Sequence, residues 1–138
     1  MRQPPDPCRM STTPDIPFAR LSGVTLAQAS GGSSRASVAL QPEHLNSQGM
    51  AHGGLAFTLA DTCMGAALRS LLEPTQTCVT VETKISYFRA GVGTTMKSES
   101  EVVHKGRSLA SMQCRVFVDG TLIAAATSTF AIRAKVGS

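Results

Sequence analysis

The hydrophobic and polar positions of the chain predict one long helix followed by a series of strands. Residues 53–72 contain no proline and stop before Pro74, and their apolar positions recur at three- and four-residue spacing on almost every side. A helix without a polar face belongs in an interior. From residue 77 onward the period changes to two, which is typical of strands. The apolar members of the first alternation are Val79, Val81, Ile85 and Tyr87.

Turn-forming residues divide the remainder of the chain into segments. Glycines interrupt the pattern at residues 91–93 and 105–106, and Asp119 with Gly120 is a strong hairpin signal. The strands between these breaks have roughly 10 to 14 residues, about twice the usual length. Upstream, the sequence predicts a short helix over residues 16–21, strands over 24–29 and 36–40 joined by a turn at 31–34, and a loop over 42–49.

These segments predict an α+β fold in which a curved antiparallel sheet of about five to six strands wraps one long central helix. The length of 138 residues suits a single domain. We place that domain at residues 16–138, after a flexible, proline-rich tail over residues 1–15.

Composition narrows the class of protein. With 42% hydrophobic and 16% charged residues the chain is an ordinary globular one, and no apolar run approaches the ~20 residues of a membrane span. The chain start has no apolar signal-peptide core, and the four cysteines are scattered, so we expect reduced thiols in the cytoplasm. The net charge of +4 suits an anionic ligand, but the absence of Trp and of any Lys/Arg run argues against nucleic acid.

Asp61 is the single charged side chain between Gly53 and Leu68. Burying even a neutral polar group without a hydrogen bond costs about 2–7 kcal/mol, and an unpaired carboxylate in an apolar interior also costs several kcal/mol. Either Asp61 is satisfied by arginine or backbone donors and has only a structural role, or its helix borders a polar cavity.

His52, Gly53 and Gly54 stand at the expected start of this helix. Free N–H groups at a helix start, unobstructed by side chains, can stabilise an oxyanion. Simple backbone geometry is the alternative explanation for the two glycines, and ordinary turn chemistry explains the preceding loop, which contains Asn46.

Helix geometry limits how these groups can cooperate. Gly53 and Asp61 are eight residues apart, so about 12 Å of helix axis separates them. A base and an oxyanion donor must each lie within roughly 3 Å of the reacting group. If both are catalytic, Asp61 acts with Gly53 of a second subunit across a two-fold axis, and the protein is at least a homodimer. The small residues at 65–67 permit close helix approach, although they also suit ordinary core packing.

Residues 46–54, with Leu59, Ala60, Asp61 and the small residues at 65–67, resemble the signature of hotdog-fold acyl-CoA thioesterases. The closest likeness is to the PaaI-type branch of phenylacetic acid degradation, over residues from about 20 to 134. The resemblance implies a hotdog fold, no cofactor, and hydrolysis of an acyl-CoA thioester, of aryl or phenylacetyl type, to free acid and CoA. Family members commonly pair dimers into tetramers, so a homotetramer is expected.

The resemblance also implies roles for individual residues. The family's helix-start amide falls on Gly53 and polarises the thioester carbonyl, and its carboxylate falls on Asp61 of the facing subunit. Asn46 matches the loop amide that places the thioester or the water, and Thr80 matches a Ser or Thr on the following strand, although it is equally a solvated strand residue. Whether Asp61 deprotonates water or attacks the carbonyl directly is left open.

Substrate-binding residues are predicted from their positions. We expect the helix-start residues to contact the substrate, apolar helix residues to line an acyl pocket, and cations near strand ends to hold the CoA phosphates, unless those cations are only solvated turn charges. The residues in question are His52, Gly54, Phe57, Met64, Arg89, Lys105 and Arg107.

Three other functions compete with this hypothesis. A metal hydrolase would use His44, His52, His104 and Asp61, but these residues form no HxH or HExxH pattern, so no metal site is expected. A hotdog enoyl-CoA hydratase or dehydratase would need a histidine paired with an acid, and Asp61 has no such partner on its helix. A non-catalytic acyl-CoA-binding hotdog protein is the remaining alternative.

Overall fold

The computed structural model describes residues 15–136, so the predicted tail, apart from Asp15, lies outside the described residues. No helix in the described range is long and apolar enough to cross a membrane. The helices are α1 (Pro17–Ser22) and α2 (Gly53–Arg69), with a 3-10 turn at Pro42–His44. The strands are β1 (Thr25–Ser30), β2 (Ser33–Ala39), β3 (Gln76–Tyr87), β4 (Thr95–Lys105), β5 (Leu109–Val118) and β6 (Thr121–Ala134).

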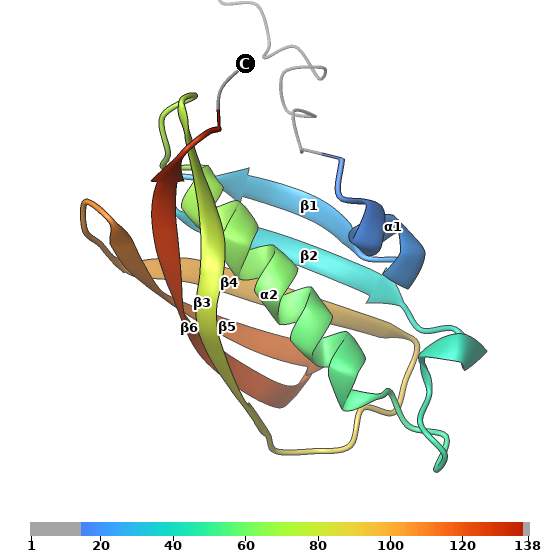
Figure 1. The fold of residues 1–138 in the computed structure, drawn as a ribbon. Helices are drawn as coiled ribbons and strands as arrows, with labels where there is room; N and C mark the ends of the chain where they lie inside the picture. The colour runs from blue at the N-terminus through green and yellow to red at the C-terminus, as the bar shows by residue number, and fades with distance from the viewer. Residues whose placement is uncertain (1–14, 137–138) are drawn as a thin grey trace, which may run out of the picture.

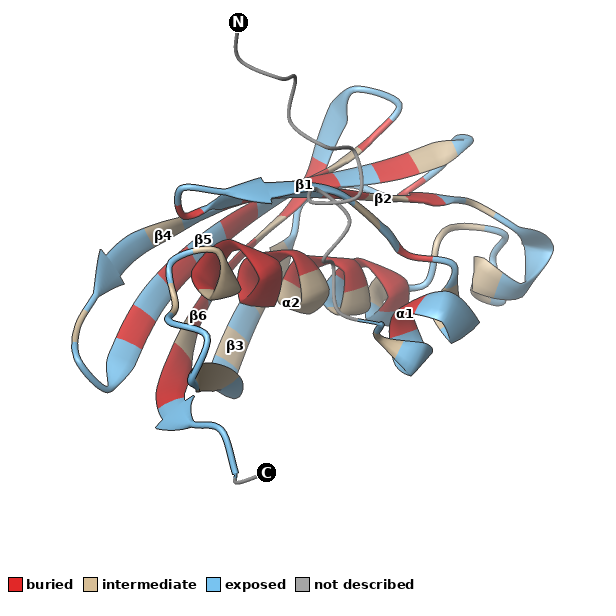
Figure 2. Ribbon diagram, turned by 90° about the horizontal axis from the view of Figure 1, so that it is seen from above, coloured by how far each residue is buried: buried red, intermediate tan, exposed pale blue. Residues whose placement is uncertain are grey.

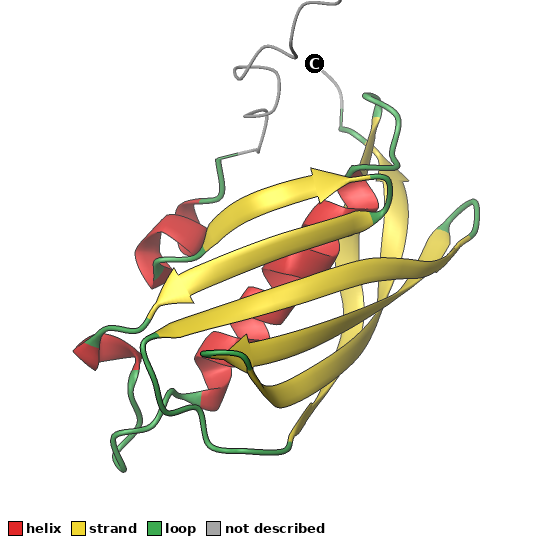
Figure 3. Ribbon diagram, turned by 180° about the vertical axis from the view of Figure 1, so that it is seen from behind, coloured by secondary structure: helices red, strands yellow, loops and turns green. Residues whose placement is uncertain are grey.

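The six strands form one antiparallel sheet in the order β1-β2-β4-β5-β6-β3, which curves around α2 (Figure 1). Seen from behind, the sheet presents its outer face and the helix lies beneath it (Figure 3). The α+β hotdog architecture predicted from the sequence is confirmed. The β1–β2 turn is shorter than predicted and has only two residues, because Gly31 and Gly32 both adopt positive φ and Ser33 and Ser34 already pair with β1.

The helix α2 forms the centre of the core. Leu59, Cys63 and Leu68 are fully buried, and the buried side of the helix faces the sheet (Figure 2). The helix ends at Arg69 rather than at the predicted residue 72, because the next residues continue in tighter turns closed on Leu68 and Arg69. The side that faces away from the sheet is uncovered: Phe57 is 38% exposed. In a single chain, one face of an otherwise apolar helix therefore meets solvent.

Strand β3 lies at the edge of the sheet and pairs only with β6. The pairing shifts by one residue between Thr80 and Glu82, which places a β-bulge at Val81. The strict two-residue alternation predicted for this strand is therefore wrong across residue 81, because a bulge reverses which side chains face the helix. Val79 and Val81 are 51% and 58% exposed beside the free edge.

Candidate active site

The loop before α2 is fixed by its own hydrogen bonds. The Asn46 side-chain oxygen accepts from the Gln48 and Met50 amides at 2.9 and 3.1 Å, and the Asn46 amide donates to the Met50 carbonyl at 2.7 Å. The Ala51 amide then donates to the Gly91 carbonyl at 2.9 Å, which ties the loop to the segment after β3. These hydrogen bonds fix the conformation of the loop that leads into α2. They also use the side-chain oxygen of Asn46 as an acceptor within the loop.

His52 is the N-cap residue of α2. Its Nδ1 atom accepts a hydrogen bond from the Gly54 amide at 2.8 Å, so this ring nitrogen is an acceptor and carries no proton. The Gly54 amide, which we expected to be free for substrate, is thus committed to the cap. Within residues 15–136 the Gly53 amide has no hydrogen-bond partner. Gly53 therefore supplies the free donor at this helix start.

Tyr87, at the end of β3, packs directly on Gly53. Its hydroxyl donates to the Gly53 carbonyl at 2.6 Å. A Cβ atom at position 53 would lie 3.1 Å from the Tyr87 Cζ atom, which explains why a glycine occupies this position. Burial raises the pKa of Tyr87, so the phenol stays protonated as the donor at neutral pH. Sequence reasoning did not single out Tyr87 because the bulge that turns it toward the helix leaves no mark in the hydrophobic pattern.

Asp61 is half-buried on the face of α2 that looks toward β3. Its Oδ1 atom accepts a hydrogen bond from the Thr80 hydroxyl at 2.7 Å. The structure thus joins two of the residues singled out in the sequence, and Thr80 is not a purely solvated strand residue. The salt bridges between described residues are Arg20–Asp15 and Arg115–Glu99, so no arginine holds Asp61 in that part of the chain. The second carboxylate oxygen remains available for water or substrate.

The two helix residues expected to line an acyl pocket occupy different environments. Phe57 lies four residues after Gly53 and four before Asp61, so all three share one helix face, and Phe57 is partly exposed there. Met64 is fully buried and its sulfur accepts from the Ser128 hydroxyl at 3.2 Å. Met64 is therefore a core residue, and its predicted place in the pocket is not supported.

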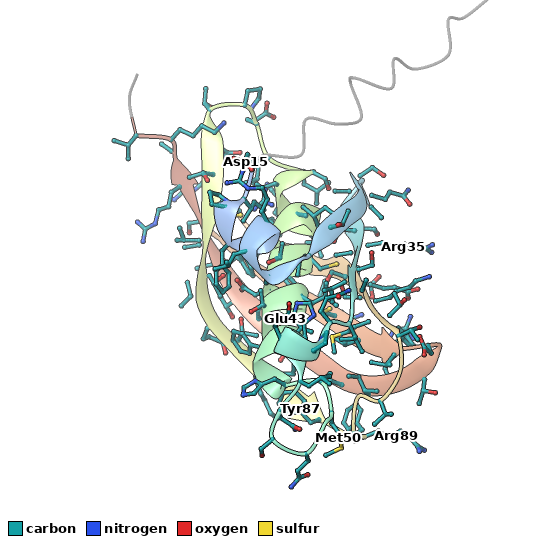
Figure 4. The ribbon with its side chains drawn as sticks, turned by 90° about the vertical axis from the view of Figure 1, so that its right-hand side faces the viewer. Asp15, Arg35, Glu43, Met50, Tyr87 and Arg89 are labelled. Carbon is teal, nitrogen blue, oxygen red and sulfur yellow. The ribbon has the colours of Figure 1, made fainter. Side chains whose placement is uncertain are left out.

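The three cations proposed for the CoA phosphates do not converge within one chain. Arg89 lies with Met50 and Tyr87 at the same end of the molecule (Figure 4). Lys105 and Arg107 belong to the β4–β5 hairpin. The Val102 amide of β4 donates to the Gly32 carbonyl, and the Gly32 amide donates to the hydroxyl of Ser70, the C-cap residue of α2. The hairpin therefore lies toward the C-terminal end of α2. Of these three cations, Arg89 is thus the one at the helix-start end of the molecule.

Two of the three histidines in the competing metal-site hypothesis, His44 and His52, bind backbone groups. Both ring nitrogens of His44 are hydrogen-bonded, Nε2 to the Ser22 carbonyl at 2.8 Å and Nδ1 to the Gln41 amide at 3.0 Å. Among the residues that the structure describes, no group of three or more His, Cys, Asp or Glu side chains could hold a metal ion. His44 and His52 are committed to loop and cap geometry.

Within a single chain, the Gly53 amide and the Asp61 carboxylate are far apart. Gly53 and Asp61 lie on one helix, separated by about 12 Å along its axis. Two hollows, of about 430 and 520 Å³, are lined largely by strand residues such as Arg35, Arg115 and Phe117, and neither includes Gly53 or Asp61. Within one chain, Gly53 and Asp61 therefore do not share a cavity.

Comparisons with known proteins identify the family to which the fold belongs. A family model described as the thioesterase superfamily matches residues 48–125, more than half of the chain, including Gly53, Asp61 and Thr80. A candidate esterase of Pseudomonas aeruginosa is 34% identical over 92 residues, which are 66% of this chain and 69% of that protein.

Solved structures of similar fold include two that bear on the chemistry. A mutant of the phenylacetic acid degradation protein PaaI from Thermus thermophilus is 26% identical, with a TM-score of 0.77 and coverage of 84% of this chain and 98% of its own. A hypothetical thioesterase from Streptococcus pneumoniae, solved with coenzyme A, is 27% identical, with a TM-score of 0.76 and coverage of 85% and 93%.

Proposed function

Since the chain belongs to the thioesterase superfamily and is a thioester hydrolase, we propose that it cleaves an acyl-CoA thioester with Asp61 of one subunit and the Gly53 amide of another. The observation that carries this proposal is the set of hydrogen-bond partners of the Asp61 carboxylate and the Gly53 amide. Asp61 is held by a hydroxyl, is free of any cation among the described residues and lies on the uncovered face of α2, and the Gly53 amide on the same face has no partner there.

A second copy of the chain is needed to bring these groups together. The roughly 12 Å between them exceeds the reach of one carbonyl group, and an antiparallel pair of helices across a two-fold axis removes that distance. The long free edge of β3, with exposed Val79 and Val81, supports such pairing, because unprotected edge strands recruit partners. We propose a homodimer as the active unit, and the expected homotetramer remains a prediction.

In the proposed reaction the Gly53 amide donates to the carbonyl oxygen as negative charge develops on it. Asp61 either takes a proton from an attacking water or attacks the carbonyl carbon itself to form an anhydride that water then hydrolyses. In both routes the carbon–sulfur bond breaks, the CoA thiolate leaves, and the free acid forms. The Thr80 hydroxyl orients the carboxylate. An oxyanion donor of this kind lowers the activation barrier by about 2.7–4 kcal/mol.

The proposed substrate is an aryl- or phenylacetyl-CoA. Phe57 supplies an exposed aromatic surface on the helix face between Gly53 and Asp61. Arg89, at the helix-start end, is the proposed partner of a CoA phosphate. The similar solved structures, one a phenylacetic acid degradation protein and one holding coenzyme A, support this choice.

Thiol release from a panel of phenylacetyl-, benzoyl- and straight-chain acyl-CoA thioesters tests the proposal. We expect aryl substrates to give the highest kcat/KM, and Asp61→Asn to abolish turnover while leaving the fold intact by circular dichroism. Full activity of Asp61→Asn, or tight CoA binding by the wild type without thiol release, would overturn the proposal. Single-turnover hydrolysis in heavy-oxygen water separates the two routes, since label in Asp61 indicates direct attack.

A further inference from the structure

We propose that Tyr87 is a positioning residue that fixes the direction of the Gly53 amide, an inference that rests on the proposed function. It is carried by two observations that the proposed chemistry does not use. One is the bulge at Val81, and the other is the contact between the Tyr87 phenol and the helix start.

The bulge brings β3 into contact with both ends of the catalytic stretch of α2. Thr80 and Tyr87 are seven residues apart, so in a regular strand their side chains would point to opposite faces of the sheet. The extra residue at Val81 reverses the alternation between them. As a result Thr80 bonds to Asp61 and Tyr87 bonds to Gly53, so one strand clamps both proposed catalytic groups.

The contacts at the helix start leave the Gly53 amide little freedom. Tyr87 binds the Gly53 carbonyl, which belongs to the same peptide group as the Gly54 amide bonded to His52. The preceding peptide group, which carries the Gly53 amide, is held at its His52 carbonyl by the Leu55 amide at 3.0 Å. Both peptide groups that flank the Gly53 Cα atom are therefore fixed. The ring also lies within 3.1 Å of the place where a Cβ atom would stand at Gly53. A donor must lie within about 0.5 Å of its productive position, so loss of the clamp lowers the rate even when the fold is kept.

Packing alone does not account for Tyr87. The side chain is 51% exposed, and its hydroxyl is directed to the backbone of the catalytic turn rather than to solvent. A residue that only filled space would tolerate loss of the hydroxyl, whereas a positioning residue would not.

The test compares Tyr87→Phe, which removes only the hydroxyl, with Phe88→Leu as the matched control. Phe88 is the next residue and is also exposed. It lines the hollow of about 430 Å³, which does not include Gly53. We expect Tyr87→Phe to lower kcat by about threefold to tenfold, the worth of one hydrogen bond, with KM nearly unchanged. Phe88→Leu should leave both constants unchanged. In Tyr87→Phe the Gly54 amide should exchange its hydrogen faster, because the capped turn loosens.

Asp61→Asn measured in parallel separates this inference from the proposed function. If Asp61→Asn stays active, the proposed site is wrong and the role of Tyr87 falls with it. If Asp61→Asn is inactive but Tyr87→Phe keeps both its kcat and its Gly54 exchange rate, only the role of Tyr87 is overturned. A loss of thermal stability without any change in kcat also overturns it, since that is the signature of a structural contact.

Discussion

Gly53 combines three requirements in one residue. Its amide has no hydrogen-bond partner among the described residues, its carbonyl accepts from Tyr87, and its missing side chain leaves room for the phenol ring, which lies 3.1 Å from the place of a Cβ atom. The backbone of the preceding N-cap residue, His52, is extended, with φ −63° and ψ 137°. This geometry is compatible with a following proline, which is also tolerated at the first position of a helix.

The Gly53→Ala and Gly53→Pro variants therefore separate the amide from the space around it. Both add a Cβ atom against Tyr87, but only proline removes the N–H group. We expect Gly53→Ala to retain measurable turnover and Gly53→Pro to lose a further factor of about 10²–10³ in kcat, the value of one oxyanion donor. Steady-state thiol release checks the difference, and equal activity of the two variants would show that the amide is not the donor.

At the scale of elements, periodicity and turn chemistry were sufficient to predict most of the fold. The central helix, the long strands and the Asp119–Gly120 hairpin all agree with the structure. The bulge at Val81 could not be predicted, because an extra residue in a strand has no fixed composition. Met64 was misplaced for a related reason: a helix that is apolar on every side does not reveal which side meets the sheet.

The same limits apply to the site. The resemblance in sequence singled out both Asp61 and Thr80, but the hydrogen bond between them emerged only from the structure. The Tyr87 contact depends on the bulge, and the cap depends on the orientation of the His52 ring, which the sequence does not fix. Contacts made by a strand register or by one side-chain rotamer are decided by tertiary packing.

The core side of α2 makes a direct prediction about stability. Leu59 is fully buried between the helix and the sheet, whereas Leu21 on α1 is exposed. Leu59→Ala should lower the free energy of unfolding by about 2–5 kcal/mol, because it removes contacts and leaves a cavity. Leu21→Ala should change it by no more than about 0.5 kcal/mol. Urea unfolding at fixed protein concentration measures both, and equal effects would contradict the assignment of the core.

The β5–β6 hairpin contains a carboxylate that responds to pH. Asp119 adopts φ 46°, and its side chain accepts from the Thr94 and Thr95 amides and the Thr94 hydroxyl, which lowers its pKa below the ordinary 3.8. Its contribution to stability is complete above the unfolded pKa and is lost as the pH falls through the lower folded value. Asparagine accepts the same left-handed backbone conformation and does not titrate.

We therefore expect Asp119→Asn to be less stable than the wild type at neutral pH and to converge toward it as the pH falls below the ordinary pKa. Midpoints of thermal unfolding across this range measure the difference. A gap between the two proteins that stays constant with pH would mean that the carboxylate charge has no part in holding the start of β4.

At the scale of the whole molecule, the sheet covers one side of its helix and leaves the chemically active side open. The curved sheet encloses the buried face of α2 (Figures 1 and 2). On the rest of the helix, Phe57 is 38% exposed, and the half-buried Gly53 and Asp61 contact the edge strand β3. Strand β3 lies at one edge of the sheet next to that face, and such an edge is a surface on which the proposed second copy can pair. On the proposed function, the fold couples assembly to chemistry, and the proposed site is complete only when the helices of two subunits meet.

Subunit complementation tests this claim most directly. Asp61→Asn and Gly53→Pro, each inactive alone, are unfolded together and refolded as a mixture, with circular dichroism as the control for folding. In half of the refolded dimers, one of the two sites pairs an intact Asp61 with an intact Gly53, so the mixture should recover about a quarter of wild-type activity. If both groups acted within one chain, every site would lack one of them, and the mixture would stay as inactive as its parents.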